Sequence, residues 1–405
     1  MAAATPADPE AAAAMDNGWN WNLPVDAFVE ILQRLPPIRR RRLRLACRHW
    51  RDVIDERAPP PRPSRPMALA YVTNTNSGWA SAYVVEDLHE GRCRKLPWTF
   101  SEDRGMVGTC NGLLCLCDNS RRGGAIVLLN PATGEKLAAP PPPPPPPCHG
   151  RGIPMYGWHE AYSFAYKVVH VPCYLDRAGG FNAVQVLTPG EAPAAAWRDV
   201  PTPGATCLLD AGLVSVDGAT YWLARDAGSV AKLDLREERV ASTAPVPAAA
   251  AAAAAAAGWK GRSRVRCHLT EVQGRLGLAV VRSNRRTASE RVEVWVLGSG
   301  GDRRGWSRRL SVQVDGDGEP WRRQRLARPH MVHGDYVLTT ESRGGQEFVL
   351  GYRMSDAGSW LRSTEVRTVR IGERMPAAAV SGMEGYLHGT FAYVPTMEPL
   401  SPYKL

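Results

Sequence analysis

The sequence predicts an α+β chain of two parts, a small N-terminal helical domain followed by an all-β propeller of six to eight blades. The first observation is a short segment whose apolar residues recur at helical spacing. The second is the proline-rich stretch 58–66, which separates this segment from the rest. The third is a long region of short apolar runs with glycine turns roughly 50–60 residues apart, which is typical of propeller blades. With 405 residues, 44% of them hydrophobic, the chain can bury a substantial core.

The net charge of +10 is a weak indication of a nucleic-acid partner. All but six of the 50 basic residues are arginine, and arginine is abundant together with alanine, glycine and proline. A coding sequence rich in G and C would enrich these same four residues. The charge is therefore interpreted as a composition bias spread over a solvated surface. No nucleic acid is expected as a partner, because that would require a clustered basic face with interleaved aromatic residues.

The N-terminus and the cysteines indicate the cytoplasm, the nucleus or both. Residues 1–18 are rich in alanine and lack the basic start of a secretory signal. No apolar run reaches the ~18–20 residues of a membrane helix, so no membrane is expected as a partner. The nine cysteines are an odd number spread over the chain, and no Asn-x-Ser/Thr sequon occurs. These features favour a reducing compartment.

Composition divides the chain into four segments. They are a disordered tail at 1–18, a helical domain at 19–57, a stiff proline-rich linker at 58–66 and the propeller at 67–405. Two low-complexity loops interrupt the propeller. The prolines of 140–147 predict polyproline II, either as an expanded loop or as a ligand for a proline-recognition module. The alanine tract 248–257 predicts a loop insertion that is helical at most transiently.

Two helices are predicted within residues 19–57. The first has an apolar face made of Phe28, Ile31, Leu32 and Leu35. Pro24 suits its first turn, and Pro36 with Pro37 ends it. The second carries apolar residues on one face and arginines on the other. A domain of about 40 residues buries too little surface to be comfortably stable alone. The hairpin is therefore expected to complete its core against another protein or, alternatively, against the C-terminal domain.

The order of residues in this segment closely resembles the F-box. The resemblance is carried by Leu23-Pro24, by Ile31-Leu32 followed by Leu35-Pro36, and by the late Trp50. It implies docking on a Skp-type adaptor, which links the chain to the cullin and RING subunits of a ubiquitin ligase. The adaptor-binding residues that it implies are Leu23, Pro24, Ile31, Leu32, Leu35, Pro36, Leu43, Leu45, Cys47 and Trp50. The chain departs from the family in the run 39–42, where Arg40 replaces a common leucine.

The region after residue 66 repeats a unit of glycine turn, strand, loop and second strand. The turn glycines are Gly112, Gly218, Gly274 and Gly334, with Gly385 as a fifth. The first interval is about twice the others, which predicts a unit near 162–172 that lacks the glycine. Strands around 68–72 and 82–85 are expected to complete a further blade with the C-terminal strand. Regular spacing over about 300 residues favours a propeller over a β-sandwich.

Several pieces of this region also resemble the F-box-associated domain of plant F-box proteins. These pieces are 110–115, 129–135, 166–169, 197–198, 218–222 and 393–400. The resemblance implies a Kelch-like propeller that recruits a protein substrate. The arginine pairs at 285–286 and 303–304 fit an acidic or phosphorylated target, although solvated loops are the simpler explanation. The substrate-binding residues themselves are not predicted.

No pattern in the sequence predicts catalysis, a metal or a cofactor. His330 and His333 lack the glutamate and the helix of a zinc hydrolase. Cys115 and Cys117 fall on one face of a predicted strand and are interpreted as core. The chain is thus predicted to be a non-catalytic substrate receptor that holds an unidentified protein near a ubiquitin ligase. The alternatives are a non-degradative F-box scaffold or regulator and, from a different class, a propeller enzyme or nucleic-acid binder.

Overall fold

The protein is described by a computed structural model that divides into two compact units, Met1–Ser64 and Arg65–Leu405. The residues that the structure describes are 24–34, 53, 66–74, 78–110, 112–118, 124–140, 161–165, 167–172, 180–188, 197–248, 250–251, 263–284, 290–298, 305–314, 323–343, 346–353, 366–371, 385–396 and 400. The boundary after Ser64 falls inside the segment interpreted as a linker. The tail 1–18 and the prolines 141–147 lie outside the described residues.

The first unit contains helix α1, Val25–Arg34. The N–H of Phe28 donates to the carbonyl of Pro24 at 3.1 Å, so the predicted proline stands directly before the first helical residue. Asp26 in the first turn and Arg34 in the last turn match the helix dipole. Of the second predicted helix, Val53 alone is among the described residues.

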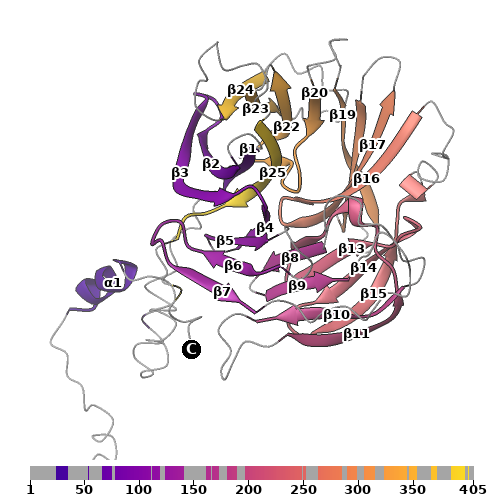
Figure 1. Ribbon diagram of the computed structural model, residues 1–405, viewed down its shortest axis with the longest axis horizontal. Helices are drawn as coiled ribbons and strands as arrows, with labels where there is room; N and C mark the ends of the chain where they lie inside the picture. Colours follow the sequence, from indigo (N-terminus) through magenta and orange to yellow (C-terminus); the bar gives the residue numbers. More distant parts are fainter. Residues whose placement is uncertain are drawn as a thin grey trace, which may run out of the picture. The chain divides into compact units, whose positions relative to one another are not determined.

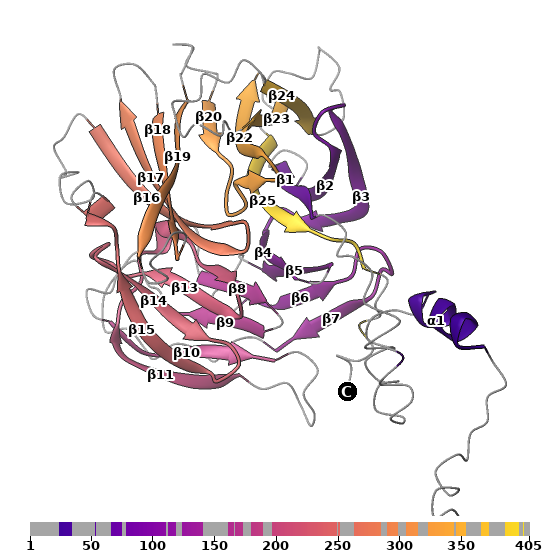
Figure 2. The same ribbon diagram turned by 180° about the vertical axis from the view of Figure 1, so that it is seen from behind.

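The second unit is a six-bladed propeller, in which antiparallel sheets form a ring (Figures 1 and 2). The first blade contains β1 (Met67–Asn74), β2 (Trp79–Asp87), β3 (Arg92–Ser101) and β25 (Gly385–Tyr393). The second contains β4 (Arg104–Cys110), β5 (Leu113–Asp118), β6 (Ile126–Leu129) and β7 (Lys136–Ala139). The third contains β8 (Ala161–Ala165), β9 (Lys167–Val171), β10 (Phe181–Leu187) and β11 (Arg198–Ala205).

The remaining three blades follow in chain order. The fourth contains β12 (Val214–Val216), β13 (Ala219–Leu223), β14 (Ser229–Asp234) and β15 (Arg239–Pro245), preceded by the short 3-10 helix Leu209–Ala211. The fifth contains β16 (Ser263–Val272), β17 (Arg275–Asn284), β18 (Glu290–Leu297) and β19 (Trp306–Val314). The sixth contains β20 (Arg323–Leu326), β21 (Val332–His333), β22 (Tyr336–Arg343), β23 (Gln346–Arg353) and β24 (Val366–Ile371).

The ring is closed by strands from opposite ends of the propeller sequence. The strand order of the first blade is β25-β1-β2-β3, and Met67 lies opposite Tyr393. This confirms the prediction that the first strands of the region form a blade with the C-terminal strand. Because the last strand is hydrogen-bonded to β1, β1 lies inside its sheet and β25 takes the end position of that sheet.

Three of the glycine turns join the first two strands of their blades, and the turn at Gly334 joins β21 to β22 in the sixth blade. Gly112, Gly218, Gly274 and Gly334 have φ angles of 77°, 69°, 76° and 57°, a left-handed conformation that side chains disfavour. The blade without a glycine turn is also confirmed, since β8 and β9 occupy 161–171. The prediction for Gly385 was wrong: it is the first residue of β25 and pairs with Asn74. In the closing blade the two strands come from opposite ends of the chain, so no turn connects them.

A second turn signal shapes the outer hairpins of three blades. The side-chain oxygen of Asp87, of Asn130 and of Asp234 each accepts hydrogen bonds from two backbone N–H groups two and three residues further on. Such Asx turns favour a tight reversal of the chain. The backbone hydrogen bond from Glu237 is the largest cause of the lowered pKa of Asp234.

The core lies between neighbouring blades. Each of six clusters of buried side chains in the described residues joins two adjacent blades, because alternate residues of a strand face opposite sides of its sheet. Leu114 and Leu116 of β5 pack toward the first blade, whereas Cys115 and Cys117 pack toward the third. The interpretation of these two cysteines as core is therefore confirmed.

The alanine tract 248–257 was predicted to be a loop, but its first residues form a helical turn that packs into the core. The N–H groups of Ala250 and Ala251 donate to the carbonyl of Pro247 at 2.8 and 3.0 Å, which forms a helical turn. Ala250 is 1% exposed and belongs to the core cluster between the fourth and fifth blades. Packing of the small side chain makes this part of the tract a fixed piece of the core rather than a loop. Residues 252–257 lie outside the described residues.

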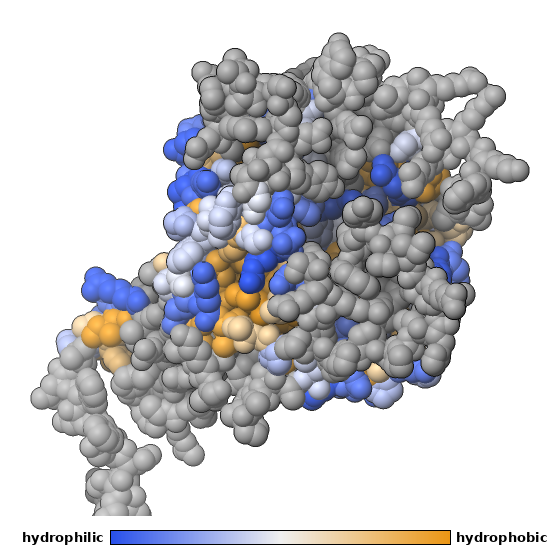
Figure 3. Space-filling view, viewed as in Figure 1, coloured by the Kyte–Doolittle hydropathy of each residue, from blue (hydrophilic) through white to orange (hydrophobic). Residues whose placement is uncertain are grey.

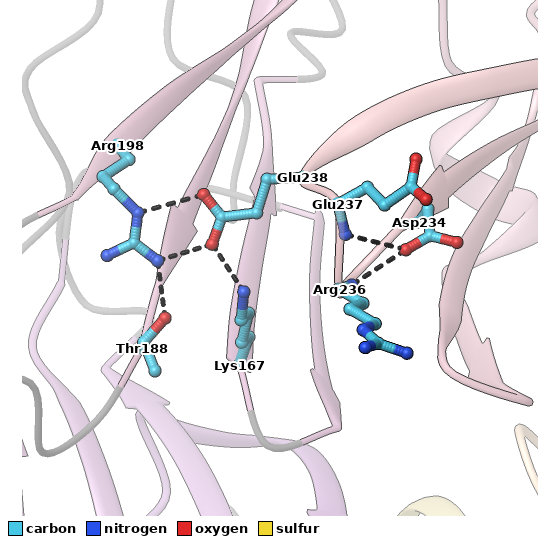
Figure 4. A network of polar contacts seen from close by, with 7 residues as sticks. All are labelled: Lys167, Thr188, Arg198, Asp234, Arg236, Glu237 and Glu238. Carbon is cyan, nitrogen blue, oxygen red and sulfur yellow. Dashed lines mark hydrogen bonds and ion pairs between the residues drawn. The ribbon is translucent and has the colours of Figure 1, made fainter.

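A half-buried carboxylate also joins the third blade to the fourth (Figure 4). Glu238, in the turn between β14 and β15, accepts hydrogen bonds from Lys167 Nζ at 2.6 Å and from Arg198 Nε and Nη2 at 3.0 and 2.5 Å. Thr188 Oγ1 accepts from the same guanidinium at 2.6 Å. The hydrogen bond from Arg198 outweighs burial and, together with Lys167, lowers the pKa of Glu238 to about 2.

Replacing Glu238 with Gln is expected to lower the free energy of unfolding by about 1–3 kcal/mol near neutral pH, since two partly buried cations lose their anion. The folded-state pKa lies below the ordinary value of 4.5, so this stabilisation is present above that value and is lost as the pH falls toward about 2. The free energies of unfolding of wild type and variant, measured with urea, should therefore become equal as the pH is lowered.

The matched control is Glu237→Gln in the same turn. Its carboxylate is 57% exposed and pairs with Arg239 on the surface, which contributes little. Equal losses in the two variants, or a difference that does not depend on pH, would contradict the role given to Glu238.

Candidate functional site

The first candidate site is the surface of helix α1. Leu32 is fully buried and packs with Val53 and with the half-buried Val25, Phe28 and Val29. Ile31, one position earlier, is 46% exposed. On α1, Figure 3 shows apolar surface beside hydrophilic surface. An exposed isoleucine next to a packed apolar face is a typical anchor for a partner.

The structure separates residues that the sequence grouped together. Ile31 and Pro24 are exposed, so their side chains are available to a partner, whereas Leu32 serves the packing of the unit itself. The other residues implied by the resemblance lie outside the described residues: Leu23, Leu35, Pro36, Leu43, Leu45, Cys47 and Trp50. Helical periodicity alone did not distinguish Ile31 from Leu32, because both fall within the broad apolar stripe of an amphipathic helix.

The second candidate site is a cavity of about 270 Å³ at the centre of the propeller. Its walls come from β4, β12, β25, the end of β16 with the turn that follows it, and the segment before β21. The lining residues are Val107, Gly108, Thr109, Leu213, Val214, Ser215, Val216, Glu271, Gly274, Pro329, His330, Phe391 and Ala392. Five blades contribute, so residues far apart in the sequence meet only because the ring closes.

Glu271 is the acidic residue of this lining. Its Oε1 accepts a hydrogen bond from the N–H of Gly274 at 2.7 Å, and its Oε2 lies 3.5 Å from His330 Nδ1. Burial would raise the pKa of Glu271, but the hydrogen bonds from His330 and Gly274 and the charge interaction with His330 outweigh it, and the net pKa is lowered. The carboxylate is therefore ionised at neutral pH while 30% of the side chain remains exposed.

Hydrogen bonds to the neighbouring inner strands hold His330 in place. The hydroxyl of Thr390 donates to the carbonyl of His330 at 2.6 Å, and the N–H of His330 donates to the carbonyl of Thr390 at 3.0 Å. On the other side, Thr270 Oγ1 donates to the carbonyl of Pro329 at 2.7 Å. His330 Nε2 lies 3.4 Å from His333 Nδ1, and burial lowers the pKa of His333 to about 4.

In the described part of the chain, no three His, Cys, Asp or Glu side chains lie close enough together to hold a metal ion. Likewise, no described helix is both long enough and apolar enough to cross a membrane. The proximity of Glu271 to His330 was not foreseen, since the two residues are 59 positions apart in the sequence.

A helical unit that precedes a six-bladed propeller in the sequence is the organisation of one class of proteins, the F-box proteins that carry a propeller. Residues 21–59 match the F-box domain, which confirms the resemblance stated for the N-terminal segment. Residues 83–313, more than half of the chain, match the KIB1-4 beta-propeller. The chain belongs to the KIB1-4 beta-propeller family. The matched residues run from the first blade into the fifth, and the structure adds the sixth blade and the closing strand.

A curated relative supports the same class. The chain is 26% identical over 172 residues to F-box protein At3g07870 of Arabidopsis thaliana, a match that spans 40% of the length of each protein.

The similar solved structures include the nidogen/laminin complex (TM-score 0.40, 9% identity, 82% of this chain and 99% of that one). Another is a functionally unknown protein of Desulfotomaculum acetoxidans (TM-score 0.39, 7% identity, 80% and 89%). These values are too low to support any inference about function.

Proposed function

We propose that this chain is the substrate receptor of an SCF-type ubiquitin ligase. The observation that carries the proposal is an F-box at 21–59 followed by a propeller that the KIB1-4 family defines. In this proposal, the F-box docks on a Skp-type adaptor that is joined to cullin and RING subunits. The propeller recruits a protein substrate. The chemistry belongs to other subunits, and this chain contributes proximity, which raises the effective concentration of the substrate.

The described helix supports the docking step of the proposal. Ile31 leaves 46% of its surface uncovered, and its helix neighbours Glu30 and Arg34 form an exposed ion pair at 2.6 Å. An apolar anchor surrounded by polar residues is the common arrangement of a protein interface. From the cysteine and sequon arguments we also propose the cytoplasm or the nucleus as the compartment.

Co-purification tests the proposal. The tagged full chain is co-expressed with a Skp-type adaptor, and the complex is isolated with the proteasome inhibited. A one-to-one complex with the adaptor, together with proteins that accumulate when the chain is depleted, is the expected result. Failure of the wild-type chain to bind the adaptor would reject the proposal. Adaptor binding without any stabilised protein would instead favour the non-degradative scaffold.

A further inference from the structure

The central cavity has a charge that contrasts with the rest of the chain. The net charge of the protein is +10, yet none of the described residues that line the cavity is a lysine or an arginine. Its ionisable residues are Glu271 and His330. A carboxylate held in a fixed position by a backbone N–H is already oriented, so a cationic ligand would bind without first ordering it.

The walls of the cavity suit the stem of a long basic side chain. Val107, Val214 and Phe391 provide apolar surface, and Glu271 provides an anionic end. Lysine and arginine have this same division, with an apolar stem of methylene groups and a charged head. A volume of about 270 Å³ accommodates one such side chain but no folded element.

The geometry leaves part of the carboxylate available for a ligand. Oε1 is used by Gly274, whereas Oε2 has only the 3.5 Å contact with His330 among its described contacts. A contact of this length is weaker than a charge-assisted hydrogen bond, which is typically about 2.7–2.9 Å long. A guanidinium or ammonium group could therefore donate to Oε2 without displacing the hydrogen bond from Gly274.

We propose that the central cavity of the propeller binds a basic side chain of the protein substrate, with Glu271 as the residue that recognises its charge. This inference rests on the proposed function, because it takes the propeller to be the part that recruits the substrate. It assigns a substrate class to a site that the sequence left open: a segment that presents an exposed arginine or lysine. The acidic or phosphorylated target considered from the arginine pairs would not suit this cavity.

Binding of small probes to the purified full chain, without adaptor, tests the proposal. The probes are the N-acetyl amides of arginine, of lysine and of citrulline, the last being a neutral analogue of arginine, and isothermal calorimetry measures their Kd. The arginine or the lysine probe is expected to bind at least about tenfold more tightly than the citrulline probe, since a charge-assisted hydrogen bond exceeds a neutral one by about that factor. Equal binding of all three probes, or no binding, would overturn the proposal.

A variant and its control locate the binding in the cavity. Glu271→Gln keeps an oxygen for the N–H of Gly274 but removes the charge, so it should lose the preference for the charged probe. Asp335→Asn removes a negative charge from an exposed turn residue outside the cavity, and this variant should retain the preference for the charged probe. If Glu271→Gln fails to fold, the comparison of the three probes on the wild-type chain still tests whether the chain prefers a cationic ligand. A failed adaptor interaction would appear in the co-purification and not in these affinities, so the two proposals fail separately.

Discussion

Replacing Ile31 with aspartate is expected to lower the affinity for a Skp-type adaptor by at least about thirtyfold, the effect of losing one interface anchor of about 2 kcal/mol. The side chain is 46% exposed, so its replacement leaves the packing around Leu32 intact. A charge introduced at the centre of an apolar contact would be desolvated without a partner, which adds to the loss. Surface plasmon resonance with purified adaptor measures the change.

Two further variants separate binding from folding. Glu30→Gln alters an exposed neighbour whose ion pair with Arg34 lies on the surface, and adaptor affinity should stay within about threefold of wild type. Leu32→Ala removes a fully buried side chain and should destabilise the helical unit by about 2–5 kcal/mol. If Ile31→Asp bound the adaptor as wild type does, Ile31 would not belong to the docking surface.

Replacing Gly112 with alanine is expected to destabilise the propeller by about 2–5 kcal/mol. The φ of Gly112 is 77°, where an added Cβ costs about 1–2 kcal/mol. That Cβ would also lie 2.6 Å from the carbonyl oxygen of Val394 and 2.7 Å from the backbone nitrogen of Thr396. These are backbone atoms of the C-terminal segment, which cannot rotate away as a side chain can, so overpacking adds about 1–3 kcal/mol.

The C-terminal segment that covers Gly112 is itself fixed in place. The N–H of Leu400 donates to Glu135 Oε2 at 2.5 Å, and Leu400 is fully buried between the second and third blades. Gly112→Ala should therefore also release this segment, which limited proteolysis near the C-terminus would detect. Urea unfolding gives the loss of stability.

Gly274→Ala is the matched control for this effect. The φ of Gly274 is 76°, almost the same as that of Gly112, but nothing lies within 4 Å of its added Cβ. The variant should lose only the strain of about 1–2 kcal/mol, and its C-terminus should stay protected. Equal losses at the two glycines would show that the C-terminal segment does not press on Gly112.

The sequence identified the turn glycines but not their different surroundings. Gly112 and Gly274 occupy the same place in a polar-glycine turn before an apolar strand, and that local pattern predicts positive φ for both. Contact of Gly112 with residues 394–396 depends on a segment more than 280 positions away. At Gly385 the local pattern failed: the similar spacing predicted a turn, whereas in the structure this glycine is the first residue of β25.

The apolar face of helix α1 was predicted as one surface, but packing buries some of its residues and leaves others exposed. Phe28, Ile31 and Leu32 all satisfy the helical period. Which of them is covered depends on the position of Val53 and its neighbours, which periodicity within one helix does not encode. The exposure of Ile31 was therefore not predictable, although its apolar character was.

By itself, the sequence determined the two-part organisation, the blade repeat, the closing strand and the family resemblance, because strand period, turn chemistry and short motifs are local. The tertiary structure alone decided which surfaces remain open. Ile31 is exposed beside a buried Leu32, and Glu271 meets His330 and Phe391 at the centre of the ring. The physical reason is that burial and cavity lining depend on contacts between distant segments, and in a closed ring these contacts form only when the first and last strands pair.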